Sequence, residues 1–440
     1  MPGRYGGWRG SWPVCRGSRE WHIPTAKVVT GWRGKVPPAV MEELFWLVAG
    51  PLVPAGDGDG DDDDDDGPVL VLGGMPVCGI DGMLVNLADT EANRAMFGCT
   101  GTRSQKGPGS APFPQLLAVV VVVVVTARAG RAKLGAITGR ARAGEQTLLA
   151  RLIRRRPDLF VGRVFVFDRN FPGHKIITAI LDAGGQVVAR VKSDLALPLA
   201  PGGGGWLSDG SRLSWLNAPS GKTSDRLPVR VAEHNAVRPC GDGQEVSETC
   251  TLITTLLDHH TVAAGQIRGA YQSRWPASET TFGEDKTTIT GAGDRTSGPV
   301  LRSGTPRLVI QEFWAWMTAT QLVRASAAAS LTTDAAAARA LRRREASGPL
   351  TTDQVSFTAA RHNAVCSMVQ SKVTAGTSLA ALAALAEDTS RATLHTLVSA
   401  ARQRHSPRAQ KARPGFPHTA VTKQPVTGVP QVTRFQPGST

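Results

Sequence analysis

Three acidic residues stand where the pattern of the chain could bring them together. Asp81 lies inside an apolar stretch typical of a strand, and Asp168 directly follows the apolar run 164–167 (VFVF). Glu279 begins a charged, helical stretch much later in the chain. Carboxylates at the ends of neighbouring strands can hold divalent cations, which activate a water or a hydroxyl for attack on a phosphodiester. Because the chain has 36 acidic residues, spacing alone leaves unrelated surface acids as the alternative.

The segments around these acids predict an α/β domain that would position them. β-Branched or alternating segments predict five strands, over residues 77–87, 116–126, 132–138, 164–167 and 186–192. Amphipathic segments predict two helices, over residues 144–155 and 173–183. The order strand–strand–strand–helix–strand–helix–strand indicates a mixed sheet.

Composition divides the chain into segments. Within the N-terminal part only residues 40–53 predict a helix, and the Asp-rich tract 61–66 reads as a solvated linker. The expected segments are a poorly defined N-terminal region with its Asp-rich linker (1–68), the first part of the α/β core (69–195), a β-rich insertion (196–264), the second part of the core (265–330), and a helical C-terminal region that continues into a basic, Pro-rich disordered tail (331–440).

Charge and cysteine usage narrow the class of protein. The 440 residues are 41% hydrophobic, enough for about two to three domains. Lysine and arginine number 50 against 36 acidic residues, and the resulting net charge of +14 favours a polyanionic partner such as nucleic acid. The six cysteines form no Cys-x2-Cys pair, so neither a disulfide scaffold nor a zinc site is expected. Since the longest apolar run, 116–125, is too short to span a membrane, we expect a cytoplasmic protein.

Several short sequence motifs follow one another along the chain, and their order is informative. Residues 271–286 (YQSRWPASETTFGEDK) are similar to a Tyr-x2-Arg-x3-Glu-x6-Lys signature, and residues 164–175 (VFVFDRNFPGHK) to an apolar strand that ends in Asp-Arg. Residues 79–98 (GIDGMLVNLADTEANRAMFG) resemble a first catalytic segment, and RVKSDLALP and SFTAARH are further matches. Together they resemble the DDE transposases of the insertion-sequence-four type, in an actinobacterial-like form, over roughly residues 41–362.

The resemblance implies a ribonuclease-H-like fold with a β-rich insertion and a helical C-terminal region. It implies that Asp81, Asp168 and Glu279 bind Mg²⁺, with Mn²⁺ as a substitute. The DNA contacts that it implies are Tyr271, Arg274, Lys286 and Arg169. The implied activity is cleavage of DNA at the terminal inverted repeats of a transposon and strand transfer into target DNA. A homodimer in the synaptic complex and a place at the bacterial nucleoid follow from the same resemblance.

One departure concerns the third acid. Four residues separate Arg274 from Glu279 where the family pattern has three, so Ser278 occupies the nominal glutamate position. On a helix this shift is a rotation of about 100°. Either a turn near Pro276 absorbs the rotation, or the rotation misdirects the carboxylate. Glu279 keeps the family interval to the later lysine and is the expected acid, with Glu284 as the fallback.

The departure leaves other functions open. A decayed copy of a transposase would keep its charge and bind DNA without cleaving it. The Asp-rich tract and the valine tract 119–125 resemble expansions that an inactive copy could accumulate. A nuclease of the same fold without strand transfer is a weaker alternative.

Overall fold

The computed structural model describes most of the chain between residues 26 and 397. The described residues are 26–50, 70–100, 113–124, 132–192, 195–199, 206–219, 221–239, 245–284, 300–331, 354–371, 376–397 and 431–434. The description covers the backbone alone at residues 26, 28–30, 235–239, 245–248, 275–284 and 431–434. The Asp-rich linker, Lys286 and most of the basic tail lie outside these ranges.

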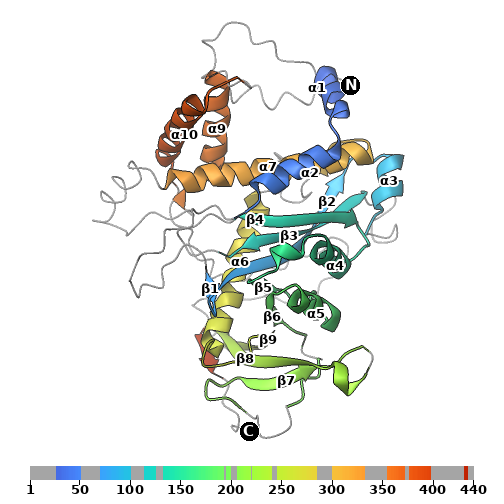
Figure 1. Ribbon diagram of the computed structural model, residues 1–440, viewed down its shortest axis with the longest axis vertical. Helices are drawn as coiled ribbons and strands as arrows, with labels where there is room; N and C mark the ends of the chain where they lie inside the picture. Colours follow the sequence, from blue (N-terminus) through green and yellow to red (C-terminus); the bar gives the residue numbers. More distant parts are fainter. Residues whose placement is uncertain are drawn as a thin grey trace, which may run out of the picture.

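An eleven-stranded mixed sheet forms the middle of the molecule (Figure 1). Its main path has the order β11-β8-β9-β6-β5-β2-β3-β4, while β1, β10 and β7 pair at its sides. The five central strands are β2 (Met75–Leu87), β3 (Gln115–Val123), β4 (Lys133–Arg140), β5 (Val164–Phe167) and β6 (Gln186–Arg190). These are the five strands that the sequence predicts, and only their ends differ.

The central strands combine antiparallel and parallel pairing. β2, β3 and β4 form an antiparallel meander. On the other side of β2, β5 pairs in parallel, and β6 pairs in parallel with β5. The two predicted helices are the crossovers, α4 (Glu145–Arg155) before β5 and α5 (His174–Asp182) before β6. The expectation of an α/β fold with a mixed sheet is therefore confirmed.

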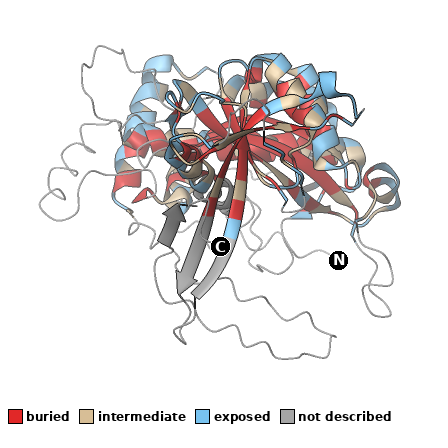
Figure 2. Cartoon of the chain, turned by 90° about the horizontal axis from the view of Figure 1, so that it is seen from below, coloured by how far each residue is buried: buried red, intermediate tan, exposed pale blue. Residues whose placement is uncertain are grey.

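The valine tract is a strand covered on both faces. The residues from Leu116 to Val124 are all buried, so the run is continuously apolar and does not alternate with polar residues. Figure 2 shows buried residues gathered along the central strands. Where α4 crosses β4, Gly139 permits a close approach, because a Cβ there would lie 2.5 Å from Cδ2 of Leu148.

Helices cover the two faces of the sheet in different ways. On one face, α4 and α5 pack through residues such as Leu148 and Ile177 against odd-numbered β3 residues and Ile80. On the opposite face, α6 (Ala264–Glu284) packs through Ile267 against Val166 and its neighbours. Farther along that face, α7 (Pro306–Ser330) packs on Val120 and other β3 residues. The cluster Phe313, Trp314, Trp316 and Met317 belongs to this core.

The predicted β-rich insertion continues the same sheet. It contains β7 (Arg212–Leu216), β8 (Leu227–Pro239) and β9 (Glu245–Thr254). β9 pairs antiparallel with β6, where Arg190 lies opposite Leu252. The insertion also anchors the start of α6, because the buried Arg230 donates a hydrogen bond of 2.5 Å to the carbonyl of Val262.

The N-terminal region differs from the expectation. Besides the predicted helix, here α2 (Pro38–Val48), the structure contains α1 (Ala26–Lys35). α2 packs on α7, and Phe45 is fully buried with its ring centroid 5.2 Å from that of Trp314. The described part of the N-terminal region, residues 26–50, therefore forms two helices, and the apolar face of α2 completes the core.

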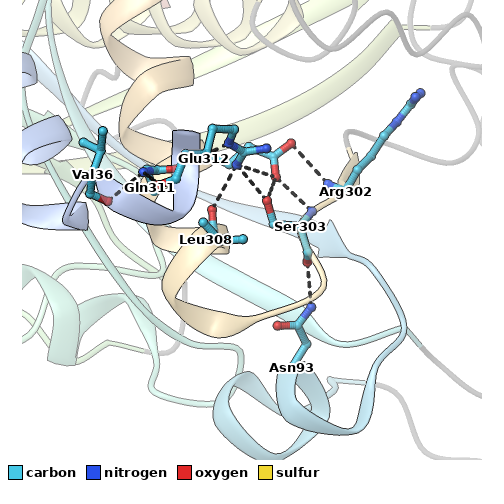
Figure 3. A network of polar contacts seen from close by, with 8 residues as sticks. Val36, Asn93, Arg302, Ser303, Leu308, Gln311 and Glu312 are labelled. Atoms are coloured by element: carbon cyan, nitrogen blue, oxygen red, sulfur yellow. Dashed lines mark hydrogen bonds and ion pairs between the residues drawn. The ribbon is translucent and has the colours of Figure 1, made fainter. Parts of the chain in front are cut away.

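A polar network fastens the junction of α1 and α2 to α7 (Figure 3). Arg33 donates from Nε to Oε1 of Gln311 at 3.2 Å and from Nη2 to Oγ of Ser303 at 2.9 Å. Ser303 in turn donates to a carboxylate oxygen of Glu312 at 2.5 Å. Its carbonyl accepts a hydrogen bond of 3.0 Å from the side-chain amide of Asn93, which joins α3 (Glu91–Phe97) to the same network.

The remaining elements are short strands and C-terminal helices. β1 (Val71–Leu72) and β10 (Val300–Leu301) both pair with β2, and short 3-10 turns lie at Pro157–Leu159 and Thr223–Asp225. The C-terminal region contains α9 (Phe357–Gln370), α10 (Leu379–Leu394) and β11 (Gln431–Arg434), which pairs with β8. Beyond residue 397, where the sequence predicts a disordered tail, the residues that the structure describes are those of β11. None of the helices in the described part of the chain combines the length and the apolar character that a membrane crossing needs.

The burial of Phe45 predicts that α2 contributes to global stability. We expect Phe45→Ala to lower the free energy of unfolding by about 3–5 kcal/mol, measured by urea denaturation, because it leaves a cavity under α2. Leu47→Ala on the same helix is the matched control, since Leu47 is 81% exposed, and its effect should stay within about 0.5 kcal/mol. Equal effects of the two substitutions would contradict the packing of α2.

Candidate active site

A gap in the pairing of β2 marks the candidate site. On the side away from β3, residues up to Ile80 pair with β5, and residues from Asn86 pair with β10. Between these two pairings, residues 81–85 have no strand partner on that side among the described residues. We call residues 81–85 the β2 window. The strand β5 ends at Phe167, which pairs with Ile80, one residue before the β2 window. Polar side chains can therefore approach the middle of the sheet at the β2 window.

Asp81 is the first residue of the β2 window. Its side chain is 30% exposed, although Cys78 and Ile80 just before it are fully buried. One carboxylate oxygen, Oδ1, accepts a hydrogen bond of 2.9 Å from the backbone N–H of Gly82. The other, Oδ2, lies 3.7 Å from Nη1 of Arg274. Two contacts from different elements therefore fix the orientation of this carboxylate.

Asp168 lies beside Asp81 across the strand pair. Ile80 and Phe167 are register partners in neighbouring parallel strands, which lie about 4.8 Å apart, and the two aspartates are the residues that follow them. Oδ1 of Asp168 accepts a hydrogen bond of 2.6 Å from the backbone N–H of Arg169, whose side chain is exposed. The structure thus brings the first two predicted acids to adjacent positions on two central strands of the sheet.

The helix α6 brings the next predicted residues to the same place. Its inner face contains Ile267, Ala270 and Arg274, all buried. The guanidinium carbon of Arg274 lies 5.5 Å from the centroid of the Tyr271 ring. Burial raises the pKa of Tyr271, with an opposing effect from the charge of Arg274 and a further rise from that of Asp168. Tyr271 therefore packs against Arg274 within range of the field of Asp168.

Sequence reasoning missed a further acid, Glu145. It is the first residue of α4 and approaches the window so closely that a Cβ on Gly82 would lie 2.1 Å from its Oε1 atom. Burial raises the pKa of Glu145, and the negative charges of Asp81 and Asp168 raise it further. The loop after Asp168 holds this end of α4, since Gln146 donates a hydrogen bond of 2.9 Å to the carbonyl of Asn170.

One signal in the sequence could have indicated this approach. Gly82 stands in the interior of a long predicted strand, where glycine weakens a strand and often marks the close approach of another group. The sequence does not indicate which group approaches. Glu145 itself reads as an ordinary acid at a helix N-terminus, where it interacts favourably with the helix dipole.

The third predicted acid, Glu279, lies on α6 one residue farther from Arg274 than the family pattern has it. The helix runs through Pro276 without a break in the described backbone, so no turn absorbs the one-residue shift. Ser278, one turn after Arg274, continues the inner face, and the backbone of Glu279 is rotated about 100° from it. The side chains of Glu279 and of Glu284, the last residue of α6, lie outside the described atoms.

The donor chemistry of the window suits a hard divalent cation. Carboxylate oxygens are the ligands that Mg²⁺ and Mn²⁺ take, and Asp81 and Asp168 supply them from adjacent strands. Within the described residues, no three His, Cys, Asp or Glu side chains come close enough together to hold a metal ion. Of the three predicted metal ligands, Asp81 and Asp168 are the two whose side chains the structure describes.

Comparisons with known proteins found no matching family model and no matching curated protein. The resemblance to the transposases therefore depends on the motifs themselves. Residues from three of these motifs lie at the β2 window, namely Asp81, Asp168 and the pair Tyr271 and Arg274. These motifs are far apart in the chain, so their meeting is a property of the fold.

The raised pKa of Glu145 predicts a pH-dependent gain of stability in Glu145→Gln. In the wild type, the stability present below the unfolded pKa of about 4.3 is lost as the pH rises through the raised folded pKa. The substitution removes the charge, so its melting temperature should equal that of the wild type near pH 4 and exceed it at pH 7, by a shift on the order of 2 °C.

Glu91→Gln is the matched control for this measurement. Glu91 is the first residue of α3, as Glu145 is of α4, but it is exposed. Loss of its favourable interaction with the helix dipole should leave stability unchanged or lower it by about 0.3–1 kcal/mol. A gain at pH 7 in both variants, or in neither, would contradict repulsion between Glu145 and the two aspartates.

Proposed function

We propose that this chain is a DDE transposase with a ribonuclease-H-like catalytic core. It cleaves DNA at the ends of its element in a reaction that depends on a divalent metal, and it joins the ends to target DNA. The ends are the terminal inverted repeats of the transposon, and two copies of the chain act together in the synaptic complex.

The observation that carries this proposal is the meeting of Asp81, Asp168 and Arg274 at the β2 window. Two neighbouring parallel strands and the helix α6 contribute one residue each. The same three residues stand in the three motifs that resemble the family. Chance similarity of short motifs gives no reason for their residues to converge, whereas a shared active site requires it.

The topology of the sheet supports the same fold family. Along the path β4-β3-β2-β5-β6, the strands β4, β3 and β2 form an antiparallel meander. The strands β5 and β6 run parallel to β2. A mixed sheet with crossover helices is compatible with the ribonuclease-H-like core that the motifs imply. Asp81 on β2 and Asp168 after β5 lie on two neighbouring strands of this sheet.

The proposed roles follow from the position of each residue. Asp81 and Asp168 hold Mg²⁺ or Mn²⁺, and Glu279 is the proposed third ligand. When bound, the metal supplies charge stabilisation at the phosphodiester. Arg169 is exposed beside Asp168, where its guanidinium can donate to a phosphate. The net charge of +14 favours association with DNA along its backbone.

A specific observation favours a second candidate, a decayed copy that binds DNA without cleaving it. Ser278 continues the inner face of α6 where the family pattern has its glutamate, and the backbone of Glu279 is rotated away. In this candidate the fold and the basic charge persist while the third acid is misplaced. The two candidates share their DNA binding and differ in cleavage.

The proposed activity predicts a set of variants that separates these candidates. Labelled DNA from the ends of the element would be incubated with Mg²⁺ or Mn²⁺, and cleavage and joining to a plasmid would be measured. We expect Asp81→Ala and Asp168→Ala to abolish both steps and to leave DNA binding intact. Glu279→Ala, Glu284→Ala and Glu145→Gln would show which acid is the third member.

Each outcome favours one interpretation. Loss of activity in Glu279→Ala and retention in Glu284→Ala would identify Glu279 as the third acid. A folded wild type that binds the ends without cleaving them would favour the decayed copy. Cleavage without joining would indicate a nuclease of the same fold. Activity that survives both aspartate substitutions would refute the proposed mechanism.

The proposed metal site also predicts a stability change that does not depend on DNA. Mn²⁺ should raise the melting temperature of the wild type, since a ligand at 100 times its dissociation constant stabilises the folded state by about 2.7 kcal/mol. The rise should disappear in Asp81→Asn and in Asp168→Asn. It should persist in Asp182→Asn, which removes an exposed acid at the end of α5. An equal rise in all four proteins would mean that Mn²⁺ binds elsewhere.

A further inference from the structure

Arg274 is a buried cation in a protein with a net charge of +14. Its side chain is 3% exposed, on the face of α6 that packs against the sheet. A contact with a DNA backbone needs donors that a phosphate can approach, and DNA-binding arginines present their guanidinium to solvent or to a groove. The burial of Arg274 is therefore at odds with a role in holding DNA.

The surroundings of Arg274 direct its guanidinium along β2. A Cβ on Gly79 would lie 3.5 Å from Cγ of Arg274, so the stem of the side chain crosses the strand where there is no side chain to obstruct it. Gly79 and Asp81 are two residues apart and face the same side of the sheet. From this stem the guanidinium extends to Oδ2 of Asp81 at 3.7 Å, with the ring of Tyr271 beside it.

The charges in the window explain why a cation is needed there. Asp81 is partly buried, and two further acids, Asp168 and Glu145, lie near it. The negative charges of Asp81 and Asp168 both act on Glu145 and raise its pKa. A carboxylate removed from water is costly unless a partner compensates for it. Arg274 provides a compensating charge from inside the protein, on the side of the sheet where α6 lies.

We propose that Arg274 is a positioning residue, an internal counter-cation that holds the Asp81 carboxylate in the β2 window, and that it does not contact DNA. It acts through Asp81. The inference rests on the proposed function only in treating the window as an active site. The pairing of the two side chains can be measured without any assumption about activity.

The test is a double-mutant cycle between the two residues. Melting temperatures would be measured in EDTA for the wild-type chain, Arg274→Gln, Asp81→Asn and the double variant. We expect Arg274→Gln to lower the melting temperature on the order of 5–10 °C, because a partly buried carboxylate loses its partner. The double variant should melt above Arg274→Gln, since no uncompensated carboxylate remains.

Arg274→Lys separates the charge from the shape of the side chain. Because this variant keeps the positive charge, its melting temperature should fall by less than half of the decrease caused by Arg274→Gln. Additive effects of Arg274→Gln and Asp81→Asn, with no recovery in the double variant, would overturn the proposal. If Arg274→Gln does not fold, recovery of folded protein by the added Asp81→Asn would support the pairing, and failure to recover would overturn it.

DNA binding provides the second arm, with Arg169→Gln as the matched exposed arginine. The affinity for a labelled random-sequence duplex would be measured by fluorescence anisotropy over a range of salt concentrations. Arg169→Gln should reduce the salt slope by about one, as expected for one lost phosphate contact. Arg274→Gln, or the double variant if the single does not fold, should leave the slope unchanged and the dissociation constant within about twofold.

The two arms separate the possible failures. A reduced slope in the Arg274 variant would make Arg274 a DNA contact and overturn the proposal. Absence of DNA binding by the wild-type chain would count against the proposed function, while the double-mutant cycle would still decide whether Arg274 positions Asp81.

Discussion

A carboxylate in the middle of a central strand is the constraint on which the rest of this structure depends. Asp81 follows a run of fully buried residues, and β3 pairs with the strand along its other side. An acid in such a place is tolerated only if space, solvent access and opposite charge reach it. The early end of β5 opens the β2 window, glycines at 79 and 82 leave room for neighbouring groups, and Arg274 supplies the charge.

The β-rich insertion has a part in meeting this constraint, because it holds the helix that carries Arg274. Arg230 on β8 donates to the carbonyl of Val262, and Asp209 accepts a hydrogen bond of 2.8 Å from the backbone N–H of Ala264. These contacts fix the first turn of α6 against strands that continue the central sheet through β9 and β6. The position of Arg274, more than two turns along a continuous helix, follows from that anchorage.

The sequence was informative where one local pattern determined the outcome. β-Branched runs predicted the five central strands, and Asp168 was placed correctly because an apolar strand ends just before it. The surroundings of the site depend on contacts between distant segments and could not be predicted in this way. The closeness of Glu145 to Gly82 depends on how α4 crosses the sheet. The burial of Phe45 and of Arg274 depends on which helix faces cover the sheet, and a pattern within one segment carries no information on that packing.

The departure at Glu279 can be understood from the same balance of charges. The compensation of Asp81 comes from Arg274 and from the backbone N–H of Gly82, and neither contact involves the later turns of α6. A one-residue shift after Arg274 therefore leaves these two contacts of Asp81 unchanged. Catalysis by three acids, in contrast, depends on the direction of each carboxylate. Folding and the proposed transposase activity are thus separable at this position, because the two contacts of Asp81 do not depend on the direction of the third carboxylate.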